Sequence, residues 1–432
     1  MTGSGWSPTP ALVRSSVAAV GLVALGVLVR RPDLLVIAAP LLLISLWSLE
    51  RRPRRAPVVE ERLAHPTVRE GQATAWGIEV TEGDDPRVET VAALFGVPPW
   101  ATLQPASGVV VAAAAHGRAS AQVVVRSIRW GRREVVPAQV VATSAWGAFR
   151  WTDVGRPSLA LSTLPVPSAF DSAAPAVHPH GHVGQHRSAR PGDGTEFASV
   201  RPFQIGDRLR RIHWPRSLRT GTLHVTSTWA DQDTLVVIVV DALNDLGESD
   251  GIDGRASSLD VTVRAAGAIA EHHLHRGDRV ALHVLGARRA RRVPPSSGRA
   301  HLRRVLESLT TIEPGTDLRD QGRLLLGLPA GALVVMLSPL ASPVALQRAV
   351  GFAARGLTTV VVDTLPPGLV TGEGDDPAHA LAWRIRLLER RREVRRIQQL
   401  GVPVVAWRGP GSLDQVLRDL HRQRSTPRLV AR

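Results

Sequence analysis

Two apolar runs dominate the beginning of the chain. They cover residues 11–29 and 34–49 and are separated by a short polar loop. The uncharged core of the first run, residues 17–29, is only about 20 Å long as a helix, which is shorter than the hydrocarbon layer of ~30 Å. Arg14 can lengthen the span because its side chain can reach the headgroups. The pattern predicts a transmembrane hairpin over residues 1–55, with a re-entrant or membrane-surface hairpin as the alternative.

The charges around this hairpin predict its orientation. Residues 51–55 contain four arginines, whereas the loop at 30–33 contains two arginines and one aspartate. Because positively charged flanks stay on the inner side, both ends of the hairpin and the soluble part that follows are expected in the cytoplasm. A cleaved signal peptide is the rival interpretation. No small-x-small cleavage site follows the first run, however, and a second run comes at once.

Residues 56–167 change to short segments rich in Val, Thr and Ala, with Gly and Pro between them. Such segments are typical of strands and turns. Strands are expected at residues 73–80, 87–93, 108–114, 122–129 and 139–145. This spacing predicts a small β-sandwich. Trp146 and Phe149 follow the last predicted strand and are expected to anchor its core.

Residues 168–190 are rich in Pro, Gly and His, which predicts a linker. Four histidines lie in it and could in principle form an imidazole metal site: His178, His180, His182 and His186. The Pro and Gly residues between them provide no scaffold, and no acidic residue lies between them to complete a ligand shell. A flexible linker is therefore the favoured interpretation.

Residues 231–432 alternate between continuous apolar strands and helical patterns. The strands are expected at 235–242, 279–286, 332–338, 358–364 and 402–407, and the helices at 258–275, 299–309, 344–355, 378–400 and 412–424. Val- and Ile-rich strands that alternate with helices indicate a parallel sheet covered on both faces. The predicted fold class is an α/β doubly wound parallel sheet, whose sites are expected at the carboxyl ends of the strands.

The net charge of +15 raises the question of nucleic-acid binding. All 53 basic residues are arginine, tyrosine is absent, and only 4% of residues are aromatic. This composition fits a GC-rich genome and membrane proximity, and no nucleic-acid recognition motif is present. We therefore expect no nucleic-acid partner. The absence of cysteine excludes disulfides and thiolate metal sites.

The most informative stretch is residues 191–230, directly ahead of the strand at 235–242. Acidic, glycine, basic and aromatic residues are too densely set there for a linker. The segment resembles the signature of the family called domain of unknown function 58. The matching residues are Gly194, Glu196, Phe197, Arg201, Gly206, Asp207, Arg210, Ile212, His213, Trp214, Arg219, Thr220, Gly221 and Leu223.

The resemblance implies more than the patterns alone. The family is a bacterial, membrane-anchored group with a von Willebrand factor A-like domain, so residues 231–432 are expected to have that fold. Localisation in the bacterial cell membrane is implied as well. Family members are typically encoded beside MoxR-type AAA+ ATPases, which implies such an ATPase as partner in a chaperone-like or envelope-related system.

The resemblance also points to a possible Mg²⁺ site. Domains of this kind bind the ion through a D-x-S-x-S turn, a later Thr and a late Asp, which together supply hard oxygen ligands. Asp241 and Thr316 match two of these positions, and Asp245 replaces a serine with another oxygen donor. Leu243 and Pro339 occupy the other two positions and cannot ligate. A degenerate site that holds no ion is the favoured prediction, with Mg²⁺ binding as the alternative.

Three roles are open for the signature. As a structural clamp, Arg210 and Arg219 would pair with Glu196 and Asp207, Gly206 and Gly221 would form turns, and His213 and Trp214 would pack against the sheet edge. As a docking surface, the segment would bind a partner. As a catalytic site, Asp207 or Glu196 would orient His213. The segment contains no nucleophile elbow, phosphate-binding glycine loop or cysteine nucleophile.

The predicted helix at 378–400 combines many arginines with an apolar row of Leu381, Ile385, Leu388 and Ile397. That row is expected to be the face docked on the sheet, with contact to anionic lipid as the alternative.

Taken together, the sequence predicts a membrane-anchored, non-enzymatic protein-interaction module, with no cofactor required. A hydrolase-like enzyme that uses Asp207 and His213 is the alternative from another class, and a basic nucleic-acid-binding protein is the third.

Overall fold

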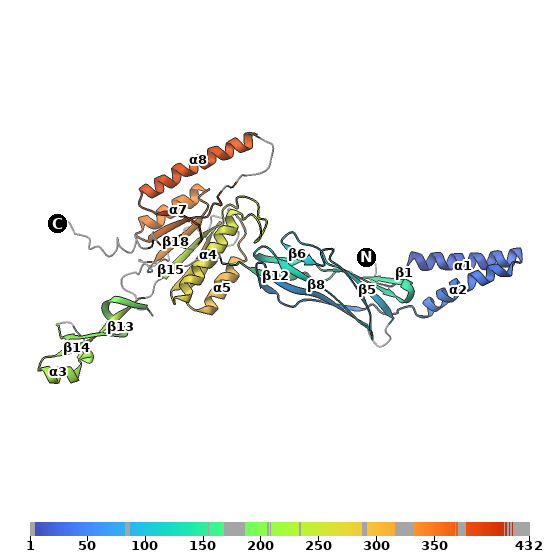
Figure 1. Cartoon of the computed structure of the whole chain (residues 1–432), viewed down its shortest axis with the longest axis horizontal. Coiled ribbons are helices and arrows are strands. Elements are labelled where there is room, and N and C mark those ends of the chain that lie inside the picture. The colour runs from blue at the N-terminus through green and yellow to red at the C-terminus, as the bar shows by residue number, and fades with distance from the viewer. Residues whose placement is uncertain are drawn as a thin grey trace. The chain divides into compact units, whose positions relative to one another are not determined.

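The computed structural model describes residues 5–82, 87–153, 155–167, 186–204, 207, 209–232, 235–286, 292–315, 328, 332–367, 369, 377–409, 411–412, 414 and 417. For residues 186–196, 198, 228–232, 377, 379 and 380 it describes the backbone only. The chain divides into two compact units, Met1–Thr163 and Leu164–Arg432 (Figure 1).

Two helices near the N-terminus, α1 (Pro10–Val29) and α2 (Pro32–Glu50), are long and apolar enough to cross a membrane. The side chains buried between them are mostly small: Leu12, Ala19 and Gly26 on α1, and Ala38, Ser45 and Ser48 on α2. Small residues let two helix backbones approach closely. Apolar side chains on the outside stay exposed, among them Leu28 and Val36, at 81% and 73%. Such a surface suits lipid better than water.

The rest of the first unit consists of antiparallel sheets. A five-stranded sheet has the order β1 (Ser7–Pro8), β11 (Phe149–Thr152), β10 (Gln139–Ser144), β5 (Val88–Leu94) and β7 (Val109–Ala113). A four-stranded sheet has the order β2 (Val58–Leu63), β4 (Ala73–Thr81), β8 (Arg118–Ser127) and β6 (Ala101–Gln104). A three-stranded sheet has the order β3 (Thr67–Arg69), β12 (Leu159–Leu164) and β9 (Gly131–Val135). Burial alternates along β8, and inward side chains of these sheets form one apolar core.

The five predicted strands of this region are present as β4, β5, β7, β8 and β10. Of the two expected core anchors, Phe149 is buried at 2% exposure. Trp146 is not an anchor, because it is 70% exposed and lies in a left-handed turn with φ of 61°. Its backbone N–H donates to Glu89 Oε2 at 2.9 Å. The turn therefore directs this indole outward, which the sequence pattern did not reveal.

The residues before α1 and those directly after α2 are held at the same β unit. In β1, Ser7 pairs with Arg150 and Pro8 with Phe149. Trp6 is buried, and its indole donates to the carbonyl of Arg55 at 2.8 Å. Both ends of the helix pair are therefore fixed to one folded β unit, a link that sequence analysis missed because β1 has only two residues.

The second unit contains a six-stranded mixed sheet. Its order is β17 (Arg292–Ser296), β16 (Arg279–Leu285), β15 (Leu235–Asp241), β18 (Leu333–Ser338), β19 (Thr358–Asp363) and β20 (Val404–Ala406). Neighbours from β16 to β20 are parallel, and the edge strand β17 is antiparallel to β16. The pattern did not predict β17, because its Pro294-Pro295 pair argues against a strand except at an edge.

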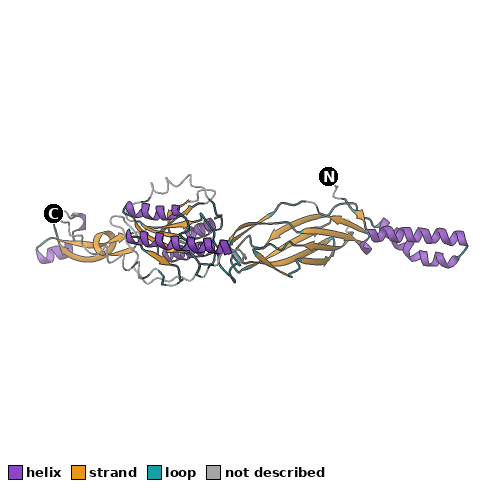
Figure 2. Ribbon diagram, turned by 90° about the horizontal axis from the view of Figure 1, so that it is seen from above, coloured by secondary structure: helices purple, strands orange, loops and turns teal. Residues whose placement is uncertain are grey.

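Helices lie on both sides of this sheet (Figures 1 and 2). They are α4 (Ser258–His275), α5 (Arg299–Leu309), α7 (Pro343–Ala354) and α8 (Pro377–Gln399). Ser257 and Asp260 form a capping box at the start of α4, and Pro343 begins α7. These helices lie within one or two residues of the predicted ranges. The last predicted helix, 412–424, falls almost wholly outside the described residues.

Helix α8 corrects one expectation. Ile397 is buried as predicted, but Leu381, Ile385 and Leu388 are exposed at 59%, 50% and 56%. Two arginines point inward instead. Arg386 donates to the carbonyl of Ala341 at 2.5 Å and Arg390 to that of Pro339 at 2.7 Å. Carbonyls beyond the end of β18 need donors, and long arginine side chains supply them.

The signature residues form a small module ahead of the sheet. Its strands β13 (His186–Pro202) and β14 (His224–Gln232) pair antiparallel. Between them lie a 3₁₀ turn, Leu209–Arg211, and the short helix α3 (Trp214–Thr220). β13 begins inside the predicted linker 168–190, whose residues 168–185, with His178, His180 and His182, lie outside the described part of the chain.

Candidate functional site

The acid of the signature is held by an arginine other than the predicted ones. Arg201 binds Asp207 through two parallel hydrogen bonds, Nη1 to Oδ2 at 2.8 Å and Nη2 to Oδ1 at 2.7 Å. The backbone N–H of Gln204 donates to Oδ2 at 2.8 Å. The hydrogen bonds from Arg201, and then that from Gln204, lower the pKa of Asp207. Asp207 thus closes the loop after β13 as a fixed anion.

The expected pairing of Arg210 and Arg219 with Asp207 is therefore wrong. Arg201 stands near the end of β13, six residues before Asp207, and the bond from Gln204 to Asp207 folds the chain back toward it. No ion pair joins Arg210 or Arg219 to a carboxylate among the described residues. The side chain of Glu196 and the whole of Gly206 lie outside that description.

His213 has a structural position at the start of α3. Its Nδ1 accepts the backbone N–H of Arg216 at 3.2 Å, which caps the helix. Its own N–H donates to the carbonyl of His224 on β14 at 2.9 Å. No hydrogen bond joins His213 to Asp207 in the described structure, and Asp207 has both carboxylate oxygens occupied by Arg201. The geometry does not bring the predicted acid and base together.

Gly221 ends the helix where a hairpin turn was expected. It has φ of 71°, and its N–H donates to the carbonyl of Ser217 at 3.0 Å. A left-handed residue after the last helical position is the usual place for glycine. Pro215 at the first turn and Gly221 after the end are the sequence signal that could have predicted α3.

The surface of the module is apolar and basic. Four large apolar side chains around α3 are exposed and are called the α3 patch here: Leu209 at 69%, Trp214 at 58%, Leu218 at 81% and Leu223 at 47%. The expectation that Trp214 packs on the sheet edge is wrong, because it stands on the first turn of α3 facing solvent. Arg210, Arg216 and Arg219 are exposed on the same segment.

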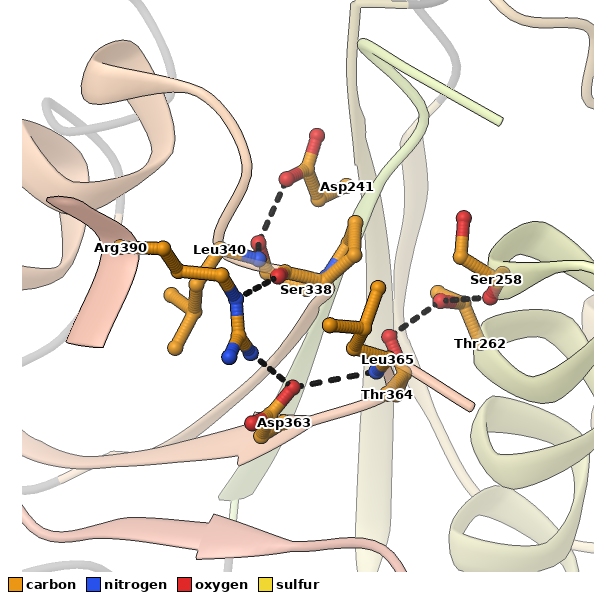
Figure 3. Close-up of polar contacts among 10 residues, drawn as sticks. Asp241, Ser258, Thr262, Ser338, Leu340, Asp363, Thr364, Leu365 and Arg390 are labelled. Carbon is orange, nitrogen blue, oxygen red and sulfur yellow. Dashed lines mark hydrogen bonds and ion pairs between the residues drawn. The ribbon is translucent and has the colours of Figure 1, made fainter. Parts of the chain in front are cut away.

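The second candidate site, at the end of β15, is closed. Asp241 is 1% exposed. Ser338 Oγ donates to its Oδ2 at 2.6 Å (Figure 3). The N–H of Leu243 donates to its Oδ1 at 3.0 Å. Burial raises the pKa of Asp241, and these two hydrogen bonds oppose the rise only in part. Ser338 Oγ accepts the N–H of Leu340 at 2.9 Å, which continues the chain of bonds.

An arginine side chain provides the positive charge near this end of the sheet. Arg390 of α8 forms an ion pair with Asp363 at the end of β19 and also donates to Pro339 (Figure 3). Asp363 Oδ1 also accepts the N–H of Leu365 at 3.0 Å. On the other side, Thr262 of α4 and Thr364 share a buried hydroxyl hydrogen bond of 2.6 Å. The polar groups at the strand ends are thus satisfied within the protein.

The oxygen atoms near the end of β15 do not fit the ligand shell of Mg²⁺. Both oxygens of Asp241 accept protein donors, and Asp245 Oδ1 accepts the N–H of Leu259 at 3.1 Å. Leu243 and Pro339 offer no side-chain oxygen, and Thr316 lies outside the described residues. Among the described residues, no group of three His, Asp or Glu is arranged to hold a metal ion. An octahedral shell of oxygen ligands is therefore not assembled here.

Comparison with known proteins gives relatives without assigned activities. One solved structure, domains 4 and 5 of the S-layer protein SbsC, matches at 11% identity with a TM-score of 0.15, covering 26% of this chain and 54% of that one. Uncharacterized proteins of Mycobacterium bovis and Mycobacterium tuberculosis are each 27% identical over 193 residues, 43% of this chain. The chain spans 59% of the length of these relatives. Residues 199–367, from β13 to just beyond β19, match the family model described as protein of unknown function DUF58.

Proposed function

We propose that the chain is a membrane-anchored protein-interaction module without a reaction of its own, and that it docks on its partner through the α3 patch. The partner that the family resemblance implies is a MoxR-type AAA+ ATPase, in a chaperone-like or envelope-related system. The observation that carries the proposal is an exposed tryptophan and three exposed leucines on a segment whose acid, Asp207, and histidine, His213, are engaged in bonds within the module.

The composition of the α3 patch supports a protein partner. Trp and Arg are the residues most enriched among those that dominate binding energy, particularly where apolar contacts shield them from water. Trp214 and Leu218 are one helical turn apart on α3, and Arg216 and Arg219 lie beside them. Among residues 197–227 the only acid is Asp207, which Arg201 neutralises. A basic, apolar surface of this kind favours a partner with an acidic, apolar face.

The sheet of the second unit supports a von Willebrand factor A-like fold for residues 231–432. The first strand of the sheet, β15, is central, later strands add outward on one side, and the antiparallel β17 closes the other edge. In sheets of this kind ligands bind beyond the carboxyl ends of the strands. At that end Asp241 is sealed, which favours docking by surfaces other than a metal site.

Membrane anchoring is supported by helices α1 and α2. At 20 and 19 residues they are each about 30 Å long, which matches the hydrocarbon layer. Their outer faces expose apolar side chains. β1 and the hydrogen bond from Trp6 to the carbonyl of Arg55 hold both ends of the pair at the same β unit. The arginines at 51–55 favour a cytoplasmic position for that unit and for the second one.

The test uses the full-length chain in lipid nanodiscs with the purified MoxR-type ATPase of the same organism. The double variant Trp214→Ser/Leu218→Ser should weaken binding by at least about a hundredfold, since each buried anchor contributes roughly 2 kcal/mol. Val111→Ser, at an equally exposed position of β7 (62%), is the matched control and should bind like the wild type. Affinity is measured by surface-immobilised nanodisc binding, with thermal unfolding as a check on folding.

Equal binding by the double variant and the wild type would contradict the α3 patch as the docking surface. The hydrolase-like alternative is tested with His213→Asn, which keeps a side-chain oxygen able to cap α3. If this variant folded and bound its partner but lost a turnover that the wild type shows, the enzyme interpretation would replace the proposed one.

A further inference from the structure

The outward face of α8 has an organisation that its packing on the sheet does not explain. At 3.6 residues per turn, Leu381, Ile385 and Leu388 lie on one face, opposite Arg390 and Ile397. All three are at least half exposed, at 59%, 50% and 56%. Single exposed apolar residues are ordinary, but a row of three on one helix face is a patch.

Exposed arginines extend this row and flank it. They are Arg384, Arg391, Arg392, Arg395 and Arg396. In the described structure none of these five forms an ion pair with a carboxylate. The two acids of the helix, Glu389 and Glu393, both lie near the inward Arg386, at 3.3 and 3.6 Å. The outward half of α8 therefore combines an apolar centre with a large excess of positive charge.

We propose that this outward face lies on the anionic surface of a lipid bilayer, the one that α1 and α2 would cross. A helix in the plane of a membrane buries its apolar row among acyl chains while flanking arginines bind phosphate groups. The stems of arginine side chains also add apolar contact when the guanidinium reaches outward to the headgroups. The chemistry of α8 fits this surface on both counts.

The anchoring by α1 and α2 explains why so short an apolar row would suffice to bind the bilayer. Three apolar residues and five arginines bind a membrane weakly by themselves. Helices α1 and α2 would hold the second unit near the bilayer, so that docking of α8 becomes an intramolecular step at high effective concentration. The α3 patch does not form such a helical membrane face. The helix α3 has only seven residues, and the apolar side chains of the patch come from a turn, a helix and a strand connection.

The experiment uses the full-length chain, which contains no cysteine, so an introduced one is a unique labelling site. Ile385→Cys is labelled with an environment-sensitive fluorophore and reconstituted in nanodiscs of phosphatidylcholine alone or with phosphatidylglycerol. We expect a blue shift and protection from an aqueous quencher only in the discs that contain phosphatidylglycerol. The same label at Val111, on the β unit, should stay exposed in both.

A label at Leu28→Cys, in α1, tests the anchoring separately. It should be protected in both lipid compositions, and if it is not, α1 does not lie in the bilayer and the proposed anchoring fails. If Leu28 is protected but the label at 385 stays exposed in both kinds of disc, the anchoring stands and the α8 proposal is overturned.

Charge variants show whether headgroups are the ligand. Arg384→Gln/Arg391→Gln/Arg395→Gln should reduce the ratio of docked to free α8 by roughly fivefold per arginine, about a hundredfold in all. Arg299→Gln/Arg303→Gln/Arg304→Gln on α5 removes the same charge from another helix and should leave the label protected. Equal losses in the two triple variants would overturn the proposal. So would a blue shift in detergent that grows with protein concentration, which would make this face an interface between copies.

Discussion

The signature module exposes large apolar side chains, whereas the end of the sheet buries a polar one. In the module, Leu218 is 81% exposed and Trp214 58%. At the end of the sheet even a carboxylic acid, Asp241, is 1% exposed and fully hydrogen-bonded. The acid at the end of the sheet is hydrogen-bonded within the protein and so stabilises the fold, whereas the apolar side chains of the module are exposed to solvent.

The size of each region gives the physical reason. A two-stranded sheet with a seven-residue helix cannot build a core of its own, so its larger side chains stay at the surface unless a partner covers them. The six-stranded sheet has helices on both faces, and its buried polar groups must find partners inside. Variants in the two regions should therefore differ in their effect on stability.

The largest effect is expected from Arg390→Leu, which removes the cation beside Asp363. The side chains of this pair are only 11% and 20% exposed, so the remaining carboxylate would be poorly compensated. The free energy of unfolding should fall by about 3 kcal/mol, measured by urea denaturation. The neighbouring Arg391→Leu faces outward and should change stability by less than about 0.5 kcal/mol. Similar losses in both variants would mean that the ion pair between Arg390 and Asp363 does not contribute specifically to the free energy of unfolding.

The next effect, smaller per pH unit than the loss above, concerns His283 on β16, which is 2% exposed. Burial, and then the charge of Arg292, lowers its pKa from 6.5 to about 4. The unfolded chain therefore takes up a proton between pH 6.5 and 4 that the native protein does not. Stability should fall on acidification in this window by about 1.4 kcal/mol per pH unit. His283→Gln should remove this part of the slope, and an unchanged slope would show that His283 is protonated in the native protein.

The smallest effect is expected at Asp207, in the module. Asp207→Asn removes the charge from the bond with Arg201, so the backbone N–H of Gln204 should exchange faster with solvent while global unfolding hardly changes. In the wild type the same protection should persist above pH 4 and be lost as the pH falls through the lowered pKa of Asp207. Hydrogen exchange at this amide measures both. A large loss of global stability would contradict the view that the module is a surface attachment.

Much of the fold was predictable because it rests on periodicity. Helices α4 and α5 and the strands β15, β16, β18 and β19 lie where continuous apolar segments and capping residues placed them. Elements without such a pattern were missed. β1 has only two residues, and β17 contains two prolines. The sequence pattern predicts only a turn at Gly221, although Pro215 and Gly221 mark the two ends of α3.

The candidate site was less predictable, since it depends on which of several equivalent partners is near. Arg201, Arg210 and Arg219 are alike in sequence, and only the turn after β13 brings Arg201 to Asp207. Helix α8 shows the same limit. Its apolar row suggested a docked face, but the unpaired carbonyls of Pro339 and Ala341 draw two arginines inward and turn that row outward.

The two apolar helices, the strand-rich region and the alternation of strands and helices follow from local hydrophobic periods, so the amino-acid sequence is enough to predict them. It also determined the poor metal chemistry, since leucine and proline cannot ligate. The tertiary structure decided which polar groups are sealed and which apolar groups are exposed. That choice depends on the packing of segments far apart in the chain, and no local pattern records it.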